Sequence, residues 1–170
     1  MEGAPELLAA FPEWKVALPG AKRGASQNDV FALVRCGSQR LAVMVEGKVK
    51  EPFGPTVAEW LAGASKGKLE RLEFLQHTLR LKGKLPDELR YQLLHRTASA
   101  VIEAERFGTQ AAAMLVHSFA PDHLWFDDYK AFAALFGIEA KVGKMARATL
   151  AKGPALYMGW AVGDPAFLKA

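Results

Sequence analysis

The stretch DVFALVRCGSQRLAVMVEGK, Asp29 to Lys48, decides the fold because it holds two apolar segments separated by a short turn. Residues 29–35 and 40–50 are rich in valine, leucine and phenylalanine, and both segments predict β-strands. The run from 41 to 45 is continuously apolar, which is typical of a central strand that is buried on both faces. Gly37 in the turn CGSQ suits the first position of a two-residue type II′ loop. The stretch therefore predicts a β-hairpin within a larger sheet.

The turn also determines which residues of the two strands lie opposite each other. If residues 37–38 form the loop, Asp29 lies opposite Glu46. Opposed residues share a face, with Cβ atoms roughly 4.5–5.5 Å apart, and Lys48 shares that face because it follows Glu46 by two positions. Two opposed carboxylates on a buried sheet repel each other, and a divalent cation such as Mg²⁺ would offset this repulsion. The alternative is a solvated strand end on which Glu46 and Lys48 pair with each other.

The rest of the chain predicts a mixed sheet flanked by helices, which is an α/β fold. Apolar periodicity and turn residues indicate the boundaries of the other elements. We expect helices over 4–11, from a capping box of Thr56 and Glu59, over 68–81, from Pro86 to Phe107, over 128–137 and over 143–151; strands over 14–18, 111–119 and 155–163; and a loop over 18–28.

Composition predicts a single domain over residues 1–170 with an ordinary globular core, since 51% of the residues are hydrophobic. No apolar run is long enough to cross a membrane, and the first residues do not read as a signal peptide. Cys36 is the only cysteine, which excludes an internal disulfide and fits a reducing compartment. We therefore expect a cytoplasmic protein. The net charge of +4 permits an anionic partner such as nucleic acid.

Asp29, followed on the next strand by Glu46, Gly47 and Lys48, resembles the D…(D/E)-x-K signature of the PD-(D/E)XK nuclease superfamily. Asn28 stands where the family name implies proline. The expected elements of residues 1 to 125 also resemble the restriction-endonuclease-like αβββαβ core of that superfamily, with a fourth strand parallel to the central one. Extra helices and a family-variable extension would make up the remainder.

This resemblance implies that Asp29 and Glu46 bind Mg²⁺ or Mn²⁺, and that Lys48 positions the water that attacks a phosphodiester bond. It implies nucleic acid as the partner, with DNA favoured over RNA, and a homodimer as the assembly. The superfamily also contains members without activity. The alternative is therefore a catalytically inactive nuclease-fold protein that binds nucleic acid or a protein partner.

Two further residues are candidates for contacts with the substrate. Gln27 precedes Asp29 by two positions and on the same register faces Lys48; it either touches the substrate or caps the preceding loop. His117 ends an apolar strand, where ligands gather in α/β sheets, and the alternative is a core histidine. Glu6 or Glu13 would add a carboxylate or lie on the surface. The chain has no phosphate-binding loop and no zinc-ligand spacing.

Overall fold

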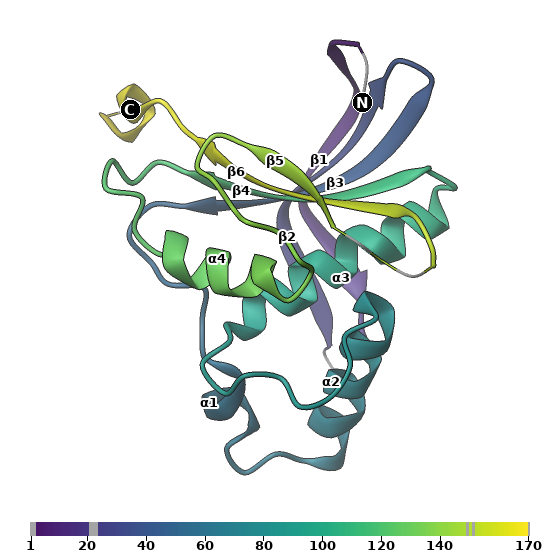
Figure 1. Ribbon diagram of the computed structural model, residues 1–170, viewed down its shortest axis with the longest axis vertical. Helices are drawn as coiled ribbons and strands as arrows, with labels where there is room; N and C mark the ends of the chain where they lie inside the picture. Colours follow the sequence, from purple (N-terminus) through teal and green to yellow (C-terminus); the bar gives the residue numbers. More distant parts are fainter. Residues whose placement is uncertain (1–2, 21–23, 149, 151, 170) are drawn as a thin grey trace.

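The computed structural model describes residues 3–20, 24–148, 150 and 152–169, which form a six-stranded sheet and the helices packed against it (Figure 1). None of the described helices combines the length and the apolar character needed to cross a membrane. In chain order the elements are β1 (Pro5–Ala17), β2 (Ala25–Cys36), β3 (Gln39–Lys48), α1 (Val57–Leu61), α2 (Lys66–Leu79), α3 (Tyr91–Arg106), β4 (Ala111–Ser118), α4 (Phe126–Ala134), β5 (Met145–Ala148), β6 (Ala155–Val162) and the 3₁₀ helix η1 (Pro165–Lys169).

The strand order is β1-β2-β3-β4-β6-β5. The first three strands are antiparallel neighbours, β4 runs parallel to β3, β6 runs parallel to β4, and β5 is antiparallel to β6. Helix α3 connects β3 to β4, and α4 lies in the connection from β4 to β6. Both crossovers move the same way across the sheet, so right-handed connections place both helices on one face. Figure 1 shows this arrangement, and the predicted α/β class with a mixed sheet is confirmed.

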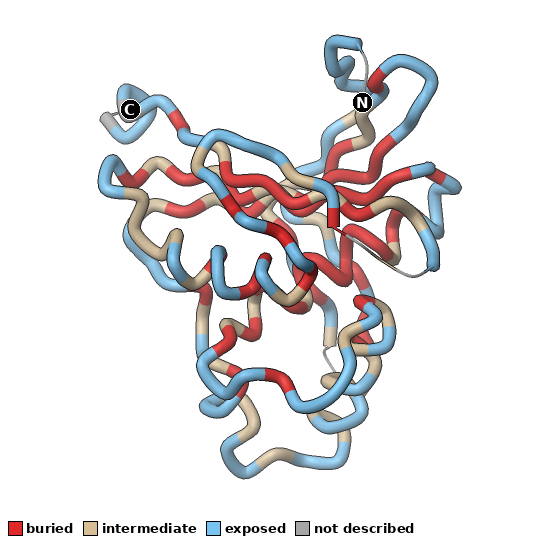
Figure 2. The backbone as a smooth tube through the Cα atoms, viewed as in Figure 1, coloured by how far each residue is buried: buried red, intermediate tan, exposed pale blue. Residues whose placement is uncertain are grey.

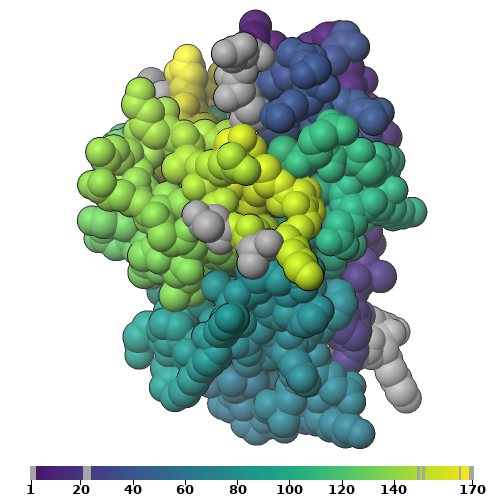
Figure 3. Space-filling view, turned by 45° about the vertical axis from the view of Figure 1, so that its right-hand side comes forward, coloured from purple at the N-terminus to yellow at the C-terminus, as the bar shows by residue number. Residues whose placement is uncertain are grey.

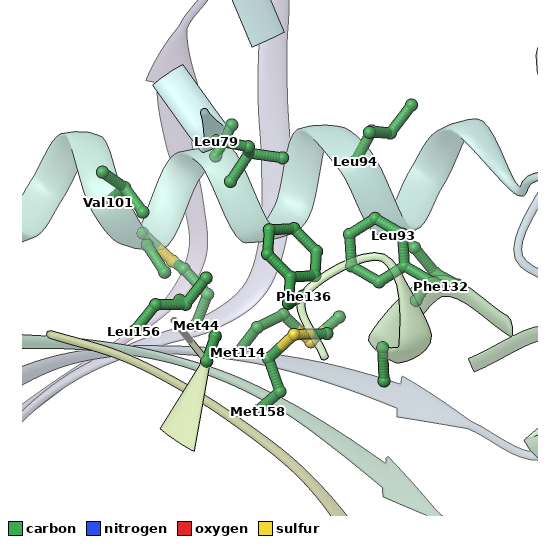
Figure 4. Packing of buried hydrophobic residues seen from close by; sticks show 14 of the residues in the cluster. Met44, Leu79, Leu93, Leu94, Val101, Met114, Phe132, Phe136, Leu156 and Met158 are labelled. Atoms are coloured by element: carbon green, nitrogen blue, oxygen red, sulfur yellow. The ribbon is translucent and has the colours of Figure 1, made fainter. Parts of the chain in front are cut away.

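The main core lies between this face of the sheet and the helices. Leu93 and Val101 of α3 point toward methionine and leucine side chains of β3, β4 and β6, while Leu94 lies on the other side of α3 (Figure 4). Phe132 of α4 and Phe136, which follows this helix, fill the adjoining space. The burial map agrees, since the central strands and α3 carry most of the buried positions (Figure 2). In the space-filling view, the segment from α4 to β6 lies above the region of α1 and α2, which forms the lower end of the molecule (Figure 3).

The hairpin has the predicted register. Cys36 pairs with Gln39, and the pairing continues without interruption to Val30 opposite Val45. Gly37 has a φ of 57°, as the first position of a type II′ turn requires. Strand β2 begins at Ala25 and therefore extends into the region predicted as a loop over 18–28, of which residues 21–23 lie outside the described residues.

The helix predicted over residues 4–11 is wrong, because this segment belongs to β1. β1 pairs with β2 from Pro5 opposite Cys36 to Ala17 opposite Ala25. A two-turn helix is marginal in water, whereas an edge strand of this length pairs its backbone with β2, so sheet pairing overrides the local helical pattern. The large apolar residues Leu7, Leu8 and Phe11 of this segment are exposed. An extended first strand therefore stands in place of the expected first helix of the core.

The start of α3 also differs from the prediction. The helix begins at Tyr91 and not at Pro86, because Arg90 forms a β-bridge with Thr56 and this pairing holds the preceding segment in a non-helical conformation. The predicted capping box of Thr56 and Glu59 is present at the start of α1. The short α1 and the bridge together fix the position of the first turn of α3 beside the end of β3.

The helix predicted over 143–151 is likewise wrong where the structure describes it. Residues 145–148 form β5, which pairs with β6 from Met145 opposite Gly159 to Ala148 opposite Leu156. Positions 149 and 151 of that prediction lie outside the described residues. The segment after β4, expected as an extension of the core, thus continues the same sheet through β6 and β5.

Candidate active site

Glu46 and Lys48 lie near the end of β3 and face the helices. Their side chains are almost completely buried, with 2% and 3% of their surfaces exposed. Lys48 Nζ donates a hydrogen bond to Glu46 Oε1 at 2.8 Å and lies 5.1 Å from the centre of the Phe53 ring. The alternative of a solvated strand end is therefore wrong for this pair.

Two residues of α3 also bind Glu46, and the sequence analysis did not identify them. Gln92 Nε2 donates to Glu46 Oε1 at 2.7 Å, and Arg96 Nε donates to Glu46 Oε2 at 2.5 Å. Gln92 and Arg96 are four residues apart, so they lie on the same side of the helix. A carboxylate removed from water needs such partners, because its desolvation is costly unless charge and hydrogen bonds compensate for it.

Asp29 lies beside the same strand end, where it bonds to the backbone of β3. Its Oδ2 accepts a hydrogen bond from Gly47 N at 2.7 Å. The last backbone pair of the ladder joins Val30 to Val45, so the carboxylate of Asp29 extends the ladder by one further bond. A Cβ at position 47 would lie 3.4 Å from Asp29 Oδ2, which is ordinary van der Waals contact, so this hydrogen bond does not depend on glycine.

The alternation of side chains in β2 slips at Asp29. Residues 26 and 28 are buried before it, and Phe31 is the next fully buried residue after it. In a strand with regular alternation, Asp29 would share the face of Phe31 and Glu46, as the sequence analysis expected. Because the alternation slips at Asp29, its carboxylate instead reaches the N–H of Gly47, which points along the sheet toward β2.

The accessory residues near the hairpin lie mainly on the surface. Gln27 is exposed and donates a hydrogen bond to Glu13 of β1, although the register placed it opposite Lys48. Glu6 forms an exposed ion pair with Arg35 at 2.6 Å, which confirms the surface alternative for Glu6. Glu13 has a φ of 54°, so β1 is irregular beside the candidate site.

His117 occupies the opposite face of the sheet from the buried pair. It is the register partner of Gly47 in the parallel β3–β4 pairing, so its side chain points away from Glu46 and Lys48. Its ring centroid lies 4.4 Å from that of Phe119. A contact between His117 and substrate therefore requires the substrate to reach around the end of the sheet.

A second polar contact lies behind Arg96. Ser26 Oγ lies 2.8 Å from His95 Nδ1, and Arg96 Nη1 donates to Ser26 Oγ at 3.3 Å. Burial, reinforced by the nearby guanidinium groups of Arg96 and Arg71, lowers the pKa of His95 to about 3. His95 is therefore neutral at physiological pH. Ser26 Oγ and His95 Nδ1 share one hydrogen bond, and the tautomer of the neutral ring determines which of them donates.

These contacts form one continuous polar chain through the interior. It joins the end of β3 to the first half of α3 and to the start of β2. Its members, in order, are Lys48, Glu46, Arg96, Ser26 and His95. Around this strand end, the buried carboxylate of Glu46 and that of Asp29 are balanced by the cations of Lys48 and Arg96. The exposed Glu51 adds a third carboxylate, which accepts from the backbone N–H groups of residues 49 and 50.

The two carboxylates fit a hard divalent cation in their chemistry. Glu46 Oε2 accepts only the bond from Arg96, and Asp29 Oδ1 accepts none from the described residues, so each carboxylate keeps a lone pair for a metal ion. Within the described part of the chain, no group of three or more His, Cys, Asp and Glu side chains is placed to hold a metal. A metal ion held here would thus have two protein ligands and several waters, as is usual for Mg²⁺.

A groove of about 500 Å³ begins directly after Lys48. It lies at the carboxyl ends of β3 and β4, the usual place for ligands in sheets of this kind. Most of its surface is apolar, and Lys50 and Asp122 supply its charged groups. It is lined by Val49, Lys50, Phe119, Ala120, Pro121, Asp122, Leu124 and Leu168.

Comparison with known proteins identifies the family of the chain. A family model described as a domain of unknown function, DUF6946, matches residues 2–165. The chain belongs to this family. No curated protein and no solved structure matches it. The DUF6946 description assigns no activity.

Proposed function

We propose that the protein is a metal-dependent hydrolase of phosphodiester bonds in nucleic acid, in which Asp29 and Glu46 bind Mg²⁺ or Mn²⁺ and Lys48 positions the attacking water. The observation that carries this proposal is the buried contact between Lys48 Nζ and Glu46 Oε1 at 2.8 Å. Asp29 adds the second carboxylate through its bond to Gly47, the residue between them. Metal-assisted attack on a phosphate requires carboxylate ligands for the metal ion and a group that positions the attacking water, all at a single site.

The order of the strands supports the proposal. Three antiparallel strands, the crossover helix α3 and a fourth strand parallel to β3 follow each other as the PD-(D/E)XK resemblance implies. Asp29 lies on the second strand and Glu46 on the third. Because one fold supports many activities, the proposal depends on the residues and not on the topology alone.

Each residue has a distinct role in the proposed reaction. When bound, the metal ion polarises the scissile phosphate and stabilises the charge that develops on it. Lys48 is a donor with three N–H bonds, of which Glu46 holds one, so the others are available to orient a water molecule. Gln92 fixes Glu46 Oε1 and thereby the orientation of the carboxylate.

The proposed substrate is DNA rather than RNA, and the proposed location is the cytoplasm. The positive net charge of +4 supports an anionic substrate, and the single, unpaired Cys36 fits a reducing compartment. We also predict a homodimer. Light scattering coupled to size-exclusion chromatography measures the molar mass that tests this prediction.

The second candidate is a nuclease-fold protein without activity that binds nucleic acid or a protein partner. The observation that favours it is the set of three donors around Glu46, which neutralises the carboxylate without a metal ion. In that case Asp29→Ala leaves binding of the partner unchanged.

A cleavage assay with Mg²⁺ or Mn²⁺ on single- and double-stranded DNA and RNA separates the two candidates. We expect cleavage by the native protein, loss of cleavage in Lys48→Ala, and full cleavage in Lys82→Ala, whose exposed lysine serves as the matched control. Thermal unfolding of each variant shows whether it is folded. Intact substrates in every condition with the native protein would exclude the hydrolase and favour the second candidate.

A further inference from the structure

Arg96 holds the carboxylate oxygen that a metal ion would need. Its Nε donates to Glu46 Oε2 at 2.5 Å, while its Nη1 donates to Ser26 Oγ at 3.3 Å. Only 8% of the residue is exposed. A metal ion at Glu46 therefore meets a guanidinium group that is already bound to the same oxygen.

The charges around Glu46 already balance without a metal ion. Asp29 and Glu46 offset Lys48 and Arg96, and Glu51, whose carboxylate lies 3.8 Å from Lys48, is exposed to screening solvent. A divalent ion would add two positive charges beside two existing cations in a region with little water. Coulomb repulsion opposes this unless a new anion arrives with the metal. The phosphates of a nucleic acid supply such an anion.

We infer that Arg96 is a phosphate-binding residue that Glu46 holds in the free protein, and that it couples binding of the metal ion to binding of nucleic acid; this inference rests on the proposed function. When the metal takes Glu46 Oε2, the guanidinium turns to a phosphate oxygen, for which its planar set of donors is suited. Ser26 remains its second anchor. By thermodynamic linkage, each ligand then raises the affinity of the other by the same factor.

A purely structural role for Arg96 predicts the opposite effect on metal binding. If Arg96 only orients Glu46, removing its charge disorders the carboxylate and leaves the affinity for metal lower or unchanged. If Arg96 competes with the metal, removing its charge raises that affinity. The direction of the change therefore distinguishes the two roles.

The test is a titration of the full-length protein with Mn²⁺, in which electron paramagnetic resonance measures the free ion, with and without a short phosphorothioate DNA duplex. Mn²⁺ bound by the duplex alone is subtracted, and a gel shows that the duplex stays intact. For the native protein we expect the duplex to tighten Mn²⁺ binding by about tenfold or more. Equal Mn²⁺ affinity with and without duplex would overturn the inference, whatever the variants do.

Three variants complete the experiment. Arg96→Gln should bind Mn²⁺ about tenfold more tightly than the native protein in the absence of DNA, and the duplex should add little. Gln92→Leu removes a neutral donor from the same carboxylate and should leave the coupling in place. Lys82→Gln is the control for an exposed charge. Mn²⁺ affinity in Arg96→Gln at or below the native value would overturn the inference, as would equal tightening in Gln92→Leu.

Failure of the inference and failure of the proposed function give different results. If neither the native protein nor any variant binds Mn²⁺ with or without DNA, the metal site itself is absent, and both the inference and the proposed function are wrong. If the native protein binds Mn²⁺ but the duplex does not change its Mn²⁺ affinity, only the inference about Arg96 is wrong. If Arg96→Gln does not fold, an absence of coupling in the native protein still overturns the inference.

Discussion

Arg96 Nε lies 2.5 Å from Glu46 Oε2, and this contact joins α3 to the end of β3 in a region where both side chains are more than nine-tenths buried. Removing one partner leaves the other charge without full compensation. We therefore expect Arg96→Met to lower the free energy of unfolding by about 3 kcal/mol, at the lower end for buried pairs because Lys48 and Gln92 remain on Glu46. Urea unfolding followed by circular dichroism measures the loss.

The matched control is Arg35→Met, which breaks the exposed pair of Arg35 and Glu6. Exposed pairs contribute about 1 kcal/mol or less, so this variant should unfold close to the native midpoint. If both variants lose the same amount, the contact in the interior contributes no more than a surface pair and the buried chain is not a stabilising feature.

His95 predicts a specific dependence of stability on pH. Burial, with Arg96 and Arg71, lowers its pKa to about 3 in the folded protein, whereas the unfolded chain has the ordinary value of about 6.5. Between these values the unfolded state binds a proton that the folded state does not. The contribution is therefore fully present above pH 6.5 and is lost as the pH falls. Below pH 6 the slope from this group approaches about 1.4 kcal/mol per pH unit.

The measurement compares the native protein with His95→Gln by urea unfolding at pH 7.5 and pH 5.5, a range in which most carboxylates stay ionised. The variant should lose less stability than the native protein over this interval. His77→Gln, which replaces an exposed histidine of α2, should behave like the native protein. Parallel losses in all three proteins would show that His95 is accessible to protons in the folded state.

The hairpin was predictable from sequence because its information is local. The glycine of the turn and the apolar segments on either side determine the pairing of Cys36 with Gln39, and every later pair follows from it. The α/β class was predictable for a similar reason, since apolar strands alternate with helical patterns after residue 56. The placement of Glu46 and Lys48 on one face was predictable because side chains alternate between the two faces along a strand.

The partners of Glu46 were not predictable in the same way. Gln92 and Arg96 appear in the sequence as polar positions of an amphipathic helix, and nothing local states that this side of α3 lies over the end of β3. That placement depends on the bridge of Arg90 with Thr56 and on packing between distant segments. The same holds for β1, whose helical pattern yields to pairing with β2.

Gly67 in α2 should show the reverse of the usual helix rule. Replacing a helical glycine by alanine normally stabilises a protein by about 1 kcal/mol. Here a Cβ on residue 67 would lie 2.0 Å from the carbonyl oxygen of Gly20, and one on Gly20, whose φ is 85°, would lie 2.0 Å from the oxygen of Gly67. Backbone must move on one side, so we expect Gly67→Ala to destabilise by about 1–3 kcal/mol.

Thermal or urea unfolding measures this change, with Glu70→Ala on the exposed side of the same helix as the control. The control should lie within about 0.5 kcal/mol of the native protein. A Gly67→Ala variant as stable as the native protein would show that Gly20 does not press against Gly67 in solution.

Asp29 offers the sharpest separation of structure from activity. Asp29→Asn keeps an acceptor for the N–H of Gly47 but loses the negative charge that a metal ion needs. We expect it to cost about 1 kcal/mol of stability, while Asp29→Ala, which also removes the acceptor, should cost about 2 kcal/mol. Both variants should lose Mn²⁺ binding and cleavage alike. Asp127→Asn, at an exposed position of α4, is the control for the loss of a carboxylate.

The two readouts for Asp29 separate the roles of its two oxygens. Oδ2 accepts the hydrogen bond from Gly47 that closes the end of the hairpin. If Asp29 has only this structural role, Asp29→Asn should leave every other property of the protein intact. A ligand role uses the carboxylate charge and predicts the same functional loss in both variants despite their different stabilities. Mn²⁺ affinity that follows the stability of the two variants, instead of the charge at residue 29, would make Asp29 a structural residue and remove one of the two ligands from the proposed site.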